Sequence, residues 1–283
     1  MVTLIVPSFS SYDGTVLAYH LKGEGEPLVC LPGGPARPCG YLGDLGGLAA
    51  QRQLILLDSR GTGKSAVPVD PGTYRVDRLV ADVEALRAHL GLETVDLLGH
   101  SAAGNLAILY AARHPDRVRR LVLVTPGLMA VGLEVTDEEW FAELERRSAE
   151  PWFDNALTAL KAWEAGDDRD EVKLAARPFF YSPWNDAAQA HARSFPAVPA
   201  AADGFNGQDA PDPEATRAAI ARLTAPVLVI CGEYDPSPTA AQAAALAGLF
   251  PNARTVSVRG AHFPWVTAPR EFASTVEEFL GRH

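Results

Sequence analysis

A short apolar run that ends in a glycine, followed at once by a serine and a helical pattern, constrains this chain most. The segment is Val95-Asp-Leu-Leu-Gly-His-Ser-Ala-Ala-Gly-Asn-Leu-Ala-Ile108. It predicts a strand to Gly99, a sharp turn at Ser101 and a helix from Ala102 to Arg113. A serine at such a corner exposes its hydroxyl above the sheet, and the first N–H groups of the helix point toward the group that it attacks. The segment therefore predicts a nucleophile elbow.

The elbow pattern is G-x-S-x-G, because larger side chains two places from the serine would crowd the crossing of strand and helix. The chain has Gly99 before the serine but Ala103 after it, and Gly104 follows one place late. Taken alone, a Gly-Ser pair between a strand and a helix also fits a simple N-cap. The remaining segments have to decide between these two interpretations.

The segments on either side alternate between short apolar runs and helical patterns. Continuous apolar runs are typical of strands buried on both faces of a parallel sheet. A hairpin at Asp13-Gly14, within residues 9–22, predicts an antiparallel edge. The predicted strands are 27–31, 53–57, 95–99, 118–124, 227–231 and 254–258, and the predicted helices are 76–90, 102–113, 239–249 and 269–280. The alternation predicts an α/β fold with a mainly parallel, doubly wound sheet.

The pattern changes for about a hundred residues after Gly127. This interval holds four of the five tryptophans, acidic helical stretches and a proline-rich segment at 196–213. We expect an inserted helical cap at 128–223 over a core domain formed by 1–127 and 224–283. The cap residues considered for substrate binding are Glu134, Trp140 and Trp184. The alternative is that the four tryptophans, Trp140, Trp152, Trp163 and Trp184, form the small core of the cap itself.

Composition excludes some classes of partner. The chain has 283 residues, with 25 basic and 35 acidic side chains and a net charge of -10. An acidic surface does not attract nucleic acid or an anionic membrane. No signal-peptide pattern or membrane span is present, so we expect a cytoplasmic location. Cys30, Cys39 and Cys231 lack the spacing of a zinc site or a disulfide framework, and we expect Cys30 and Cys231 to be buried thiols.

A serine nucleophile needs a base, and the base needs an acid that orients it. Suitable residues follow two of the predicted strands: Asp235 lies beyond 227–231, and His262 lies beyond 254–258. The order Ser101, Asp235, His262 is the Ser-acid-His order of α/β-hydrolases. Glu233 is an alternative acid, since Asp235 before a proline also fits a turn. Two further histidines, His100 and His114, are poorly placed for a base.

The negative charge on an attacked carbonyl needs preorganised N–H donors. One expected donor is the N–H of Ala102, and the other is Gly34 in the loop Leu31-Pro-Gly-Gly-Pro-Ala36. The segment 58–65 ends like a phosphate-binding P-loop, but that motif requires glycine five places before Gly63, where this chain has Asp58. A nucleotide-binding role is therefore disfavoured.

Five segments together resemble the α/β-hydrolase superfamily: Pro32-Gly-Gly-Pro-Ala36, Asp58-Ser-Arg-Gly-Thr-Gly-Lys-Ser65, the Gly-His-Ser elbow, Gly232-Glu-Tyr-Asp235 and Gly260-Ala-His262. The first two look like the prolyl aminopeptidase (proline iminopeptidase) branch. The resemblance implies a triad of Ser101, His262 and Asp235 under a helical cap. It also implies release of an N-terminal residue from a peptide or amide, without a metal or organic cofactor.

The chain departs from the pattern of that branch at several positions. Pro32 stands where the branch has histidine, and Ala36 where it has glycine. An aminopeptidase also needs cap carboxylates to bind the substrate's α-ammonium group. The candidates are Glu134, Asp137, Glu138, Glu139, Asp186, Asp203 and Asp209, and the sequence does not choose among them.

We therefore expect a serine hydrolase that acts through an acyl-enzyme on a small aminoacyl amide or short peptide. The alternatives are an esterase or lactonase for an apolar small molecule, a non-catalytic small-molecule binder, and a lyase or carbon–carbon hydrolase that uses the same three residues. The oligomeric state stays open.

Overall fold

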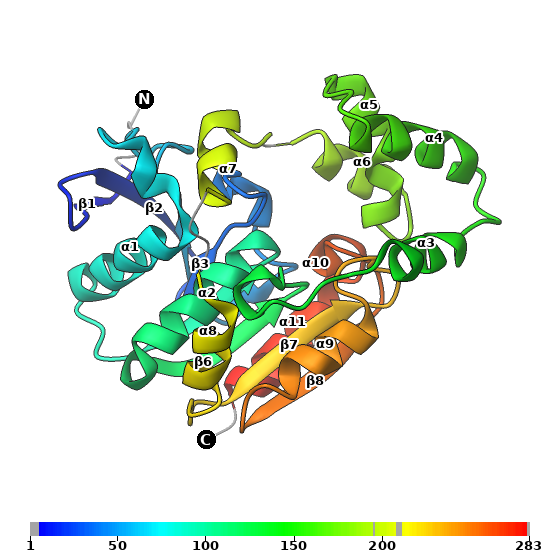
Figure 1. The fold of residues 1–283 in the computed structure, drawn as a ribbon. Coiled ribbons are helices and arrows are strands. Elements are labelled where there is room, and N and C mark those ends of the chain that lie inside the picture. The colour runs from blue at the N-terminus through cyan, green and yellow to red at the C-terminus, as the bar shows by residue number, and fades with distance from the viewer. Residues whose placement is uncertain (1–5, 195, 208–210, 282–283) are drawn as a thin grey trace.

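A computed structural model describes residues 6–194, 196–207 and 211–281. Its eight-stranded sheet has the order β1-β2-β4-β3-β5-β6-β7-β8 (Figure 1). The strands are β1 Ser8–Ser10, β2 Val16–Lys22, β3 Pro27–Leu31, β4 Gln53–Leu57, β5 Val95–His100, β6 Val118–Val124, β7 Val227–Gly232 and β8 Ala253–Val258. The β1–β2 and β2–β4 pairs are antiparallel and the other pairs are parallel. The predicted mainly parallel α/β sheet is confirmed.

Helices cover both faces of this sheet. One face is packed by α1 Val76–His89, α2 Ala102–Arg113 and α9 Ala240–Ala247, and the other by α10 Pro264–Thr267 and α11 Pro269–Leu280. Successive strand residues enter opposite cores: Leu97 packs on the α1–α2 side and Leu98 on the α11 side. Because both faces are covered, the central strands are continuous apolar runs.

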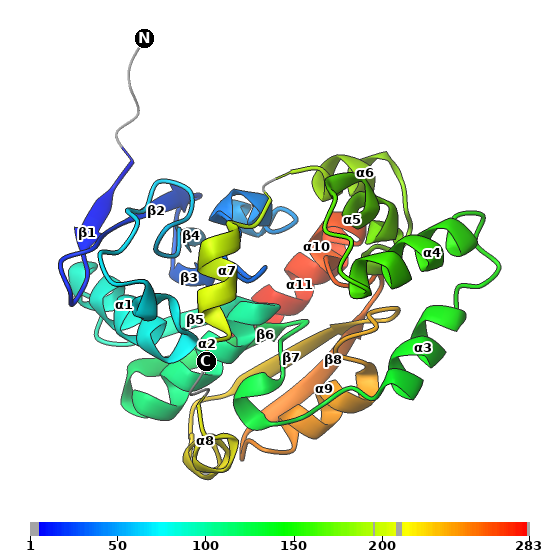
Figure 2. The same ribbon diagram turned by 45° about the horizontal axis from the view of Figure 1, so that its top comes forward.

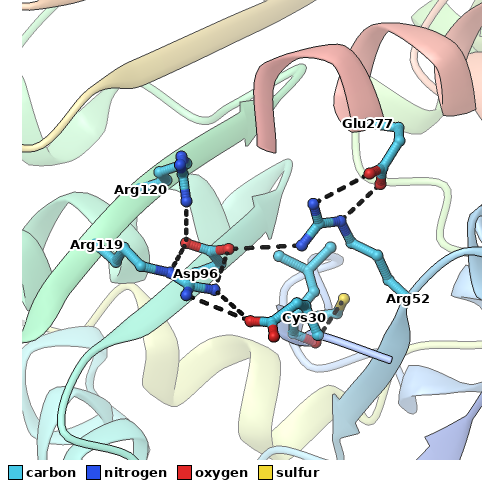
Figure 3. A network of polar contacts seen from close by, with 8 residues as sticks. Cys30, Arg52, Asp96, Arg119, Arg120 and Glu277 are labelled. Carbon is cyan, nitrogen blue, oxygen red and sulfur yellow. Dashed lines mark hydrogen bonds and ion pairs between the residues drawn. The ribbon is translucent and has the colours of Figure 1, made fainter. Parts of the chain in front are cut away.

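A buried ion-pair network anchors β5 at its amino end (Figure 3). The carboxylate of Asp96 accepts hydrogen bonds from Arg119 Nε at 2.9 Å and Nη2 at 2.7 Å. Arg52 lies 3.7 Å from the same carboxylate and also pairs with Glu277 of α11 at 2.6 Å. Paired partners offset the cost of burying these charges. The network lies at the opposite end of β5 from Ser101, so it holds the strand and takes no part in the site.

The segment between β6 and β7 contains α3 Asp137–Glu145, α4 Phe153–Glu164, α5 Asp170–Ala176, α6 Asp186–Ala192, α7 Pro199–Phe205 and α8 Pro213–Ile220. In both ribbon views, α3 to α6 gather at one side of the molecule (Figures 1 and 2). Helices α3 to α5 share a small core that includes Leu144, Leu160 and Phe179, whereas Ala188 of α6 joins the core on the α11 side of the sheet. Helix α8 instead packs against α2, and its Ile220 joins the core of the sheet. The cap boundaries at 128 and 223 remain a prediction.

Two smaller features concern the class of protein. No described helix is long and apolar enough to cross a membrane. Cys30 on β3 and Cys231 on β7 are buried free thiols, as expected, and Cys39 is a third. Cys39 opens a short 3₁₀ turn, η1 Cys39–Leu42, which packs on the α11 side of the sheet.

Candidate active site

Ser101 stands at a sharp corner between β5 and α2. Its backbone angles are φ 54° and ψ −127°, in a left-handed region that costs a non-glycine residue free energy. Gly99 is needed here, because a Cβ at this position would lie 2.6 Å from the carbonyl oxygen of Ala103. Ala103 itself is fully buried in the core beneath α2, which accommodates its methyl group. The elbow thus forms in spite of the alanine.

Three residues predicted from the ends of separate strands meet at this corner. The Oγ of Ser101 lies 2.9 Å from His262 Nε2. The Nδ1 of the same ring lies 3.0 Å and 3.3 Å from the two carboxylate oxygens of Asp235. A carboxylate accepts, so Nδ1 carries the proton and Nε2 is left to accept one from the serine hydroxyl. The arrangement is that of a nucleophile, a base and an orienting acid.

Two effects on the pKa of Asp235 oppose each other. The residue is 2% exposed, and burial raises the pKa of its carboxyl, whereas the charges of His262 and Arg147 lower it. Arg147, at the end of α3, is also buried and donates to the carbonyl oxygens of Phe179 and Tyr181. Burial lowers the pKa of Arg147 to about 10, so it stays charged at neutral pH. The alternative acid, Glu233, is exposed and forms no described contact with His262.

The loop after β3 passes directly over the elbow. A Cβ on Gly33 would lie 2.7 Å from Ser101 Cβ and 3.2 Å from the nitrogen of Ala102. The N–H of Gly33 is already used, since it donates to Tyr41 Oη at 2.7 Å. Within the described residues, the N–H of Gly34 has no such partner. The assignment of the oxyanion donors to Gly34 and Ala102 stays a prediction.

The cap candidates lie at different distances from the base. The ring of Phe180 is 5.9 Å from that of His262, and Trp140 packs on Phe180 at 6.5 Å. The indole N–H of Trp140 is buried and has no hydrogen-bond partner among the described residues. Trp184 instead packs on Tyr181 at 5.5 Å. Glu134 is exposed, and its backbone carbonyl accepts from Gln242 of α9.

The acidic side chains considered for an α-ammonium group do not converge on the site. The described ones are all exposed: Glu134, Asp137, Glu138, Glu139, Asp186 and Asp203. Glu139 accepts from the backbone N–H of Thr136 and so caps α3. Asp209 lies outside the described residues. No carboxylate in the described part of the cap contacts Ser101 or His262.

The segment that ends like a P-loop has a structural role. The carboxylate of Asp58 accepts from the backbone N–H groups of Cys39 and Lys64, both at 2.9 Å, and lies 3.0 Å from His20 Nε2. His20, Cys39 and Asp58 have ligand atoms within 4.8 Å of one another. However, both oxygens of Asp58 already accept N–H groups, and burial raises the pKa of the Cys39 thiol. We assign this cluster to folding of the loop and not to a metal.

Comparisons with known proteins identify the fold family. Residues 26–269 match the alpha/beta hydrolase fold family. The chain is 27% identical over 272 residues to a proline iminopeptidase of Heyndrickxia coagulans, with 92% of each chain covered.

Two solved structures share the fold. One is an esterase from Exiguobacterium antarcticum, with a TM-score of 0.72, 18% identity and coverage of 98% of this chain and 100% of that chain. The other is a proline iminopeptidase from Mycobacterium smegmatis, with a TM-score of 0.71, 21% identity and coverage of 97% and 98%. This chain therefore belongs to the α/β-hydrolase fold family.

Proposed function

We propose that the chain is a serine hydrolase that cleaves a small amide or peptide bond through an acyl-enzyme. Ser101 attacks the carbonyl carbon while His262 takes its proton, and His262 then donates that proton to the leaving group. Asp235 orients the imidazole and stabilises its positive form. The continuous hydrogen-bond line from Ser101 Oγ through His262 to Asp235, at 2.9 Å and 3.0 Å, carries this proposal.

The N–H groups of Gly34 and Ala102 stabilise the oxyanion in this scheme, each contributing about 3 kcal/mol to the transition state. Water then attacks the acyl-enzyme with His262 as base again. The serine, the base, the acid and the backbone donors supply every step, so the proposed reaction needs no metal or organic cofactor. In this scheme the cap bounds the substrate through Phe180, whose ring lies beside that of His262, and through Trp140, which packs on Phe180.

The substrate we propose first is an aminoacyl amide or short peptide with a free N-terminus. The similarity to a named proline iminopeptidase along nearly the whole chain supports it. A second candidate is an ester of an apolar acid. The aromatic surface at Phe180 and Trp140 favours this candidate, as do the exposed cap carboxylates, since an ester needs no partner for an ammonium group.

The test is turnover of prolyl 4-nitroanilide and 4-nitrophenyl butyrate by the wild type and by Ser101→Ala. Loss of the nucleophile leaves only binding and the oxyanion donors, so we expect kcat to fall by at least about 10³-fold. Ser274→Ala is the matched control, because Ser274 is an exposed serine on α11.

Ser101-dependent cleavage of the anilide supports the aminopeptidase. Ser101-dependent turnover of the ester alone supports the esterase. Absence of turnover together with absence of labelling by a fluorophosphonate contradicts the hydrolase and supports the binder. Labelling at Ser101 without hydrolysis of either substrate directs the search to lyase or carbon–carbon cleavage chemistry.

A further inference from the structure

His100 directly precedes the nucleophile and is buried, with 1% exposure. Its Nε2 lies 3.0 Å from the backbone carbonyl oxygen of His262, and its Nδ1 lies 2.7 Å from Tyr41 Oη. A carbonyl only accepts, so Nε2 carries the proton. Burial and the neighbouring His262 hold the pKa of His100 well below its usual value. The ring is therefore neutral, and Nδ1 accepts a hydrogen bond from the tyrosine hydroxyl.

Tyr41 connects this ring to the loop over the elbow. Its hydroxyl oxygen accepts the N–H of Gly33 at 2.7 Å while its proton goes to His100. The tyrosine is 2% exposed, and burial raises its pKa, so the hydroxyl stays protonated. The guanidinium of Arg37 lies 4.1 Å from the ring centroid and packs against its face. Tyr41 is thus fixed in position by contacts on its face and at its hydroxyl.

We propose that Tyr41 and His100 are positioning residues. They hold the loop at residues 32–36, called here the oxyanion loop, in a fixed position relative to the nucleophile and the base. The hydrogen bonds run in one direction: Gly33 N–H to Tyr41 Oη, Tyr41 O–H to His100 Nδ1, and His100 Nε2–H to the carbonyl of His262. Every donor and acceptor along this chain is satisfied, which is how a buried polar network becomes rigid. The inference rests on the proposed hydrolase function, because the positioned groups are the oxyanion loop and the base.

The other contacts of the base show why its carbonyl matters. The same His262 carbonyl accepts from Thr125 Oγ1 at 3.1 Å, and the His262 N–H donates to the carbonyl of Phe180 at 3.1 Å. The backbone of the base is thus held on both sides, by β6 and β5 at its carbonyl and by the cap at its N–H. On the loop side, Tyr41 is the one acceptor of the Gly33 N–H among the residues that the structure describes. Loss of the Tyr41 hydroxyl therefore loosens the loop more than it loosens His262.

The chain offers a matched control in a second pair of the same construction. Tyr181 Oη lies 2.7 Å from His191 Nδ1, and His191 Nε2 lies 2.8 Å from the carbonyl oxygen of Tyr41. Tyr181 is also buried. Tyr181→Phe therefore removes one buried hydroxyl from a tyrosine–histidine–carbonyl chain without touching the oxyanion loop directly.

The experiment compares Tyr41→Phe with Tyr181→Phe on whichever substrate the wild type turns over through Ser101. A displaced oxyanion donor acts on the transition state and not on substrate binding. We expect kcat to fall by about 10- to 100-fold in Tyr41→Phe, with KM changed less than about threefold. Tyr181→Phe is expected to keep kcat within about threefold of the wild type. The pH dependence of kcat/KM should keep the wild-type shape in both variants, because neither substitution removes a side-chain contact between Ser101, His262 and Asp235.

Hydrogen exchange of the loop peptide spanning residues 32–36 is a second readout that needs no activity. The Gly33 amide loses its acceptor in Tyr41→Phe, so its exchange should accelerate, while Tyr181→Phe should leave it unchanged. Equal losses of kcat in the two variants, a change in KM alone, or unchanged exchange at residues 32–36 in Tyr41→Phe would each overturn the assignment. A wild type without Ser101-dependent turnover contradicts the proposed function, and the exchange result then decides the positioning role by itself.

Discussion

The charge of Asp235 depends on the residues that surround it. Burial raises the pKa of the carboxyl, and the hydrogen bond from His262 and the charge of Arg147 counteract that effect. The hydrogen bonds of Arg147 found among the described residues go to backbone carbonyls. It therefore favours the charged acid from a distance, without competing for the oxygens that His262 uses.

Asp235→Asn should lower kcat by about 10³- to 10⁴-fold, because an amide cannot stabilise the imidazolium and its N–H₂ group favours the wrong tautomer of His262. Steady-state kinetics on the ester or anilide measures the loss. Glu233→Gln is the control and should stay within about twofold of the wild type, since Glu233 is exposed. A loss in Glu233→Gln as large as that in Asp235→Asn would assign the acid to Glu233 instead.

Individual site residues could be predicted from the sequence where they follow a strand. Ser101, Asp235 and His262 each follow a predicted strand, and the carboxyl ends of parallel strands lie at one edge of a sheet. Tyr41 and Arg147 carry no comparable signal. One lies in a 3₁₀ turn and the other at the end of a cap helix, and their contacts depend on packing between segments far apart in the chain.

At the scale of elements, the loop after β3 lies close against the elbow. A Cβ on Gly33 would lie 2.5 Å from the carbonyl oxygen of His100, which is backbone and cannot move aside. Gly33→Ala should therefore displace the loop. We expect a stability loss of about 1–3 kcal/mol from overpacking and a fall in kcat of at least about tenfold, since a small misplacement of catalytic groups is costly.

The matched control is Gly248→Ala at the end of α9, where an added Cβ finds its nearest atom at 3.4 Å, an ordinary contact. Gly248→Ala should be neutral or stabilise the fold by up to about 1 kcal/mol, through the reduced freedom of the unfolded chain. Urea unfolding and kinetics on both variants make the comparison. Normal activity in Gly33→Ala would show that the loop is not held against the elbow.

The elements of the core were predictable because their signals are local. Strands β3, β4 and β6 and helices α2 and α11 have the predicted bounds, since apolar runs and proline or glycine punctuation mark their ends. The cap resisted prediction for a physical reason. Its helices are short, and they are held by aromatic contacts such as Trp152 on Phe179 and by Arg147 on backbone carbonyls. Such contacts leave no periodic pattern.

For the whole molecule, the cap and the core are joined beside the oxyanion loop. His191 of α6 donates a hydrogen bond from Nε2 to the carbonyl oxygen of Tyr41. Arg37 donates to the carbonyl oxygen of Ser194 at 2.9 Å. The N–H of Val198 also donates to the carbonyl of Ala36 at 3.0 Å. The loop that carries Gly34 therefore touches the cap on one side and the elbow on the other.

Two histidines near this contact, buried His100 and half-buried His191, are neutral at pH 7, and they set the direction in which the stability changes with pH. Burial lowers the pKa of His191 to about 4. The hydrogen bond to the Tyr41 backbone raises this pKa, whereas the charges of Arg37 and Arg177 lower it further. The pKa of His100 is also well below 6.5. Below pH 6.5 the unfolded chain binds protons that the folded chain does not, so the free energy of unfolding falls as the pH falls.

From pH 7 to pH 5, His191 alone should cost about 2 kcal/mol of stability, because a difference of one pKa unit is worth about 1.4 kcal/mol. His191→Gln keeps an N–H donor for the Tyr41 carbonyl but does not titrate, so its stability should fall less steeply over the same range. Urea unfolding at pH 8, 7, 6 and 5 measures both slopes. Between pH 7 and 8, where both states of His191 bind few protons, the two curves should run nearly parallel. A variant that loses as much stability between pH 7 and 5 as the wild type would show that His191 is not the neutral group that joins cap to core.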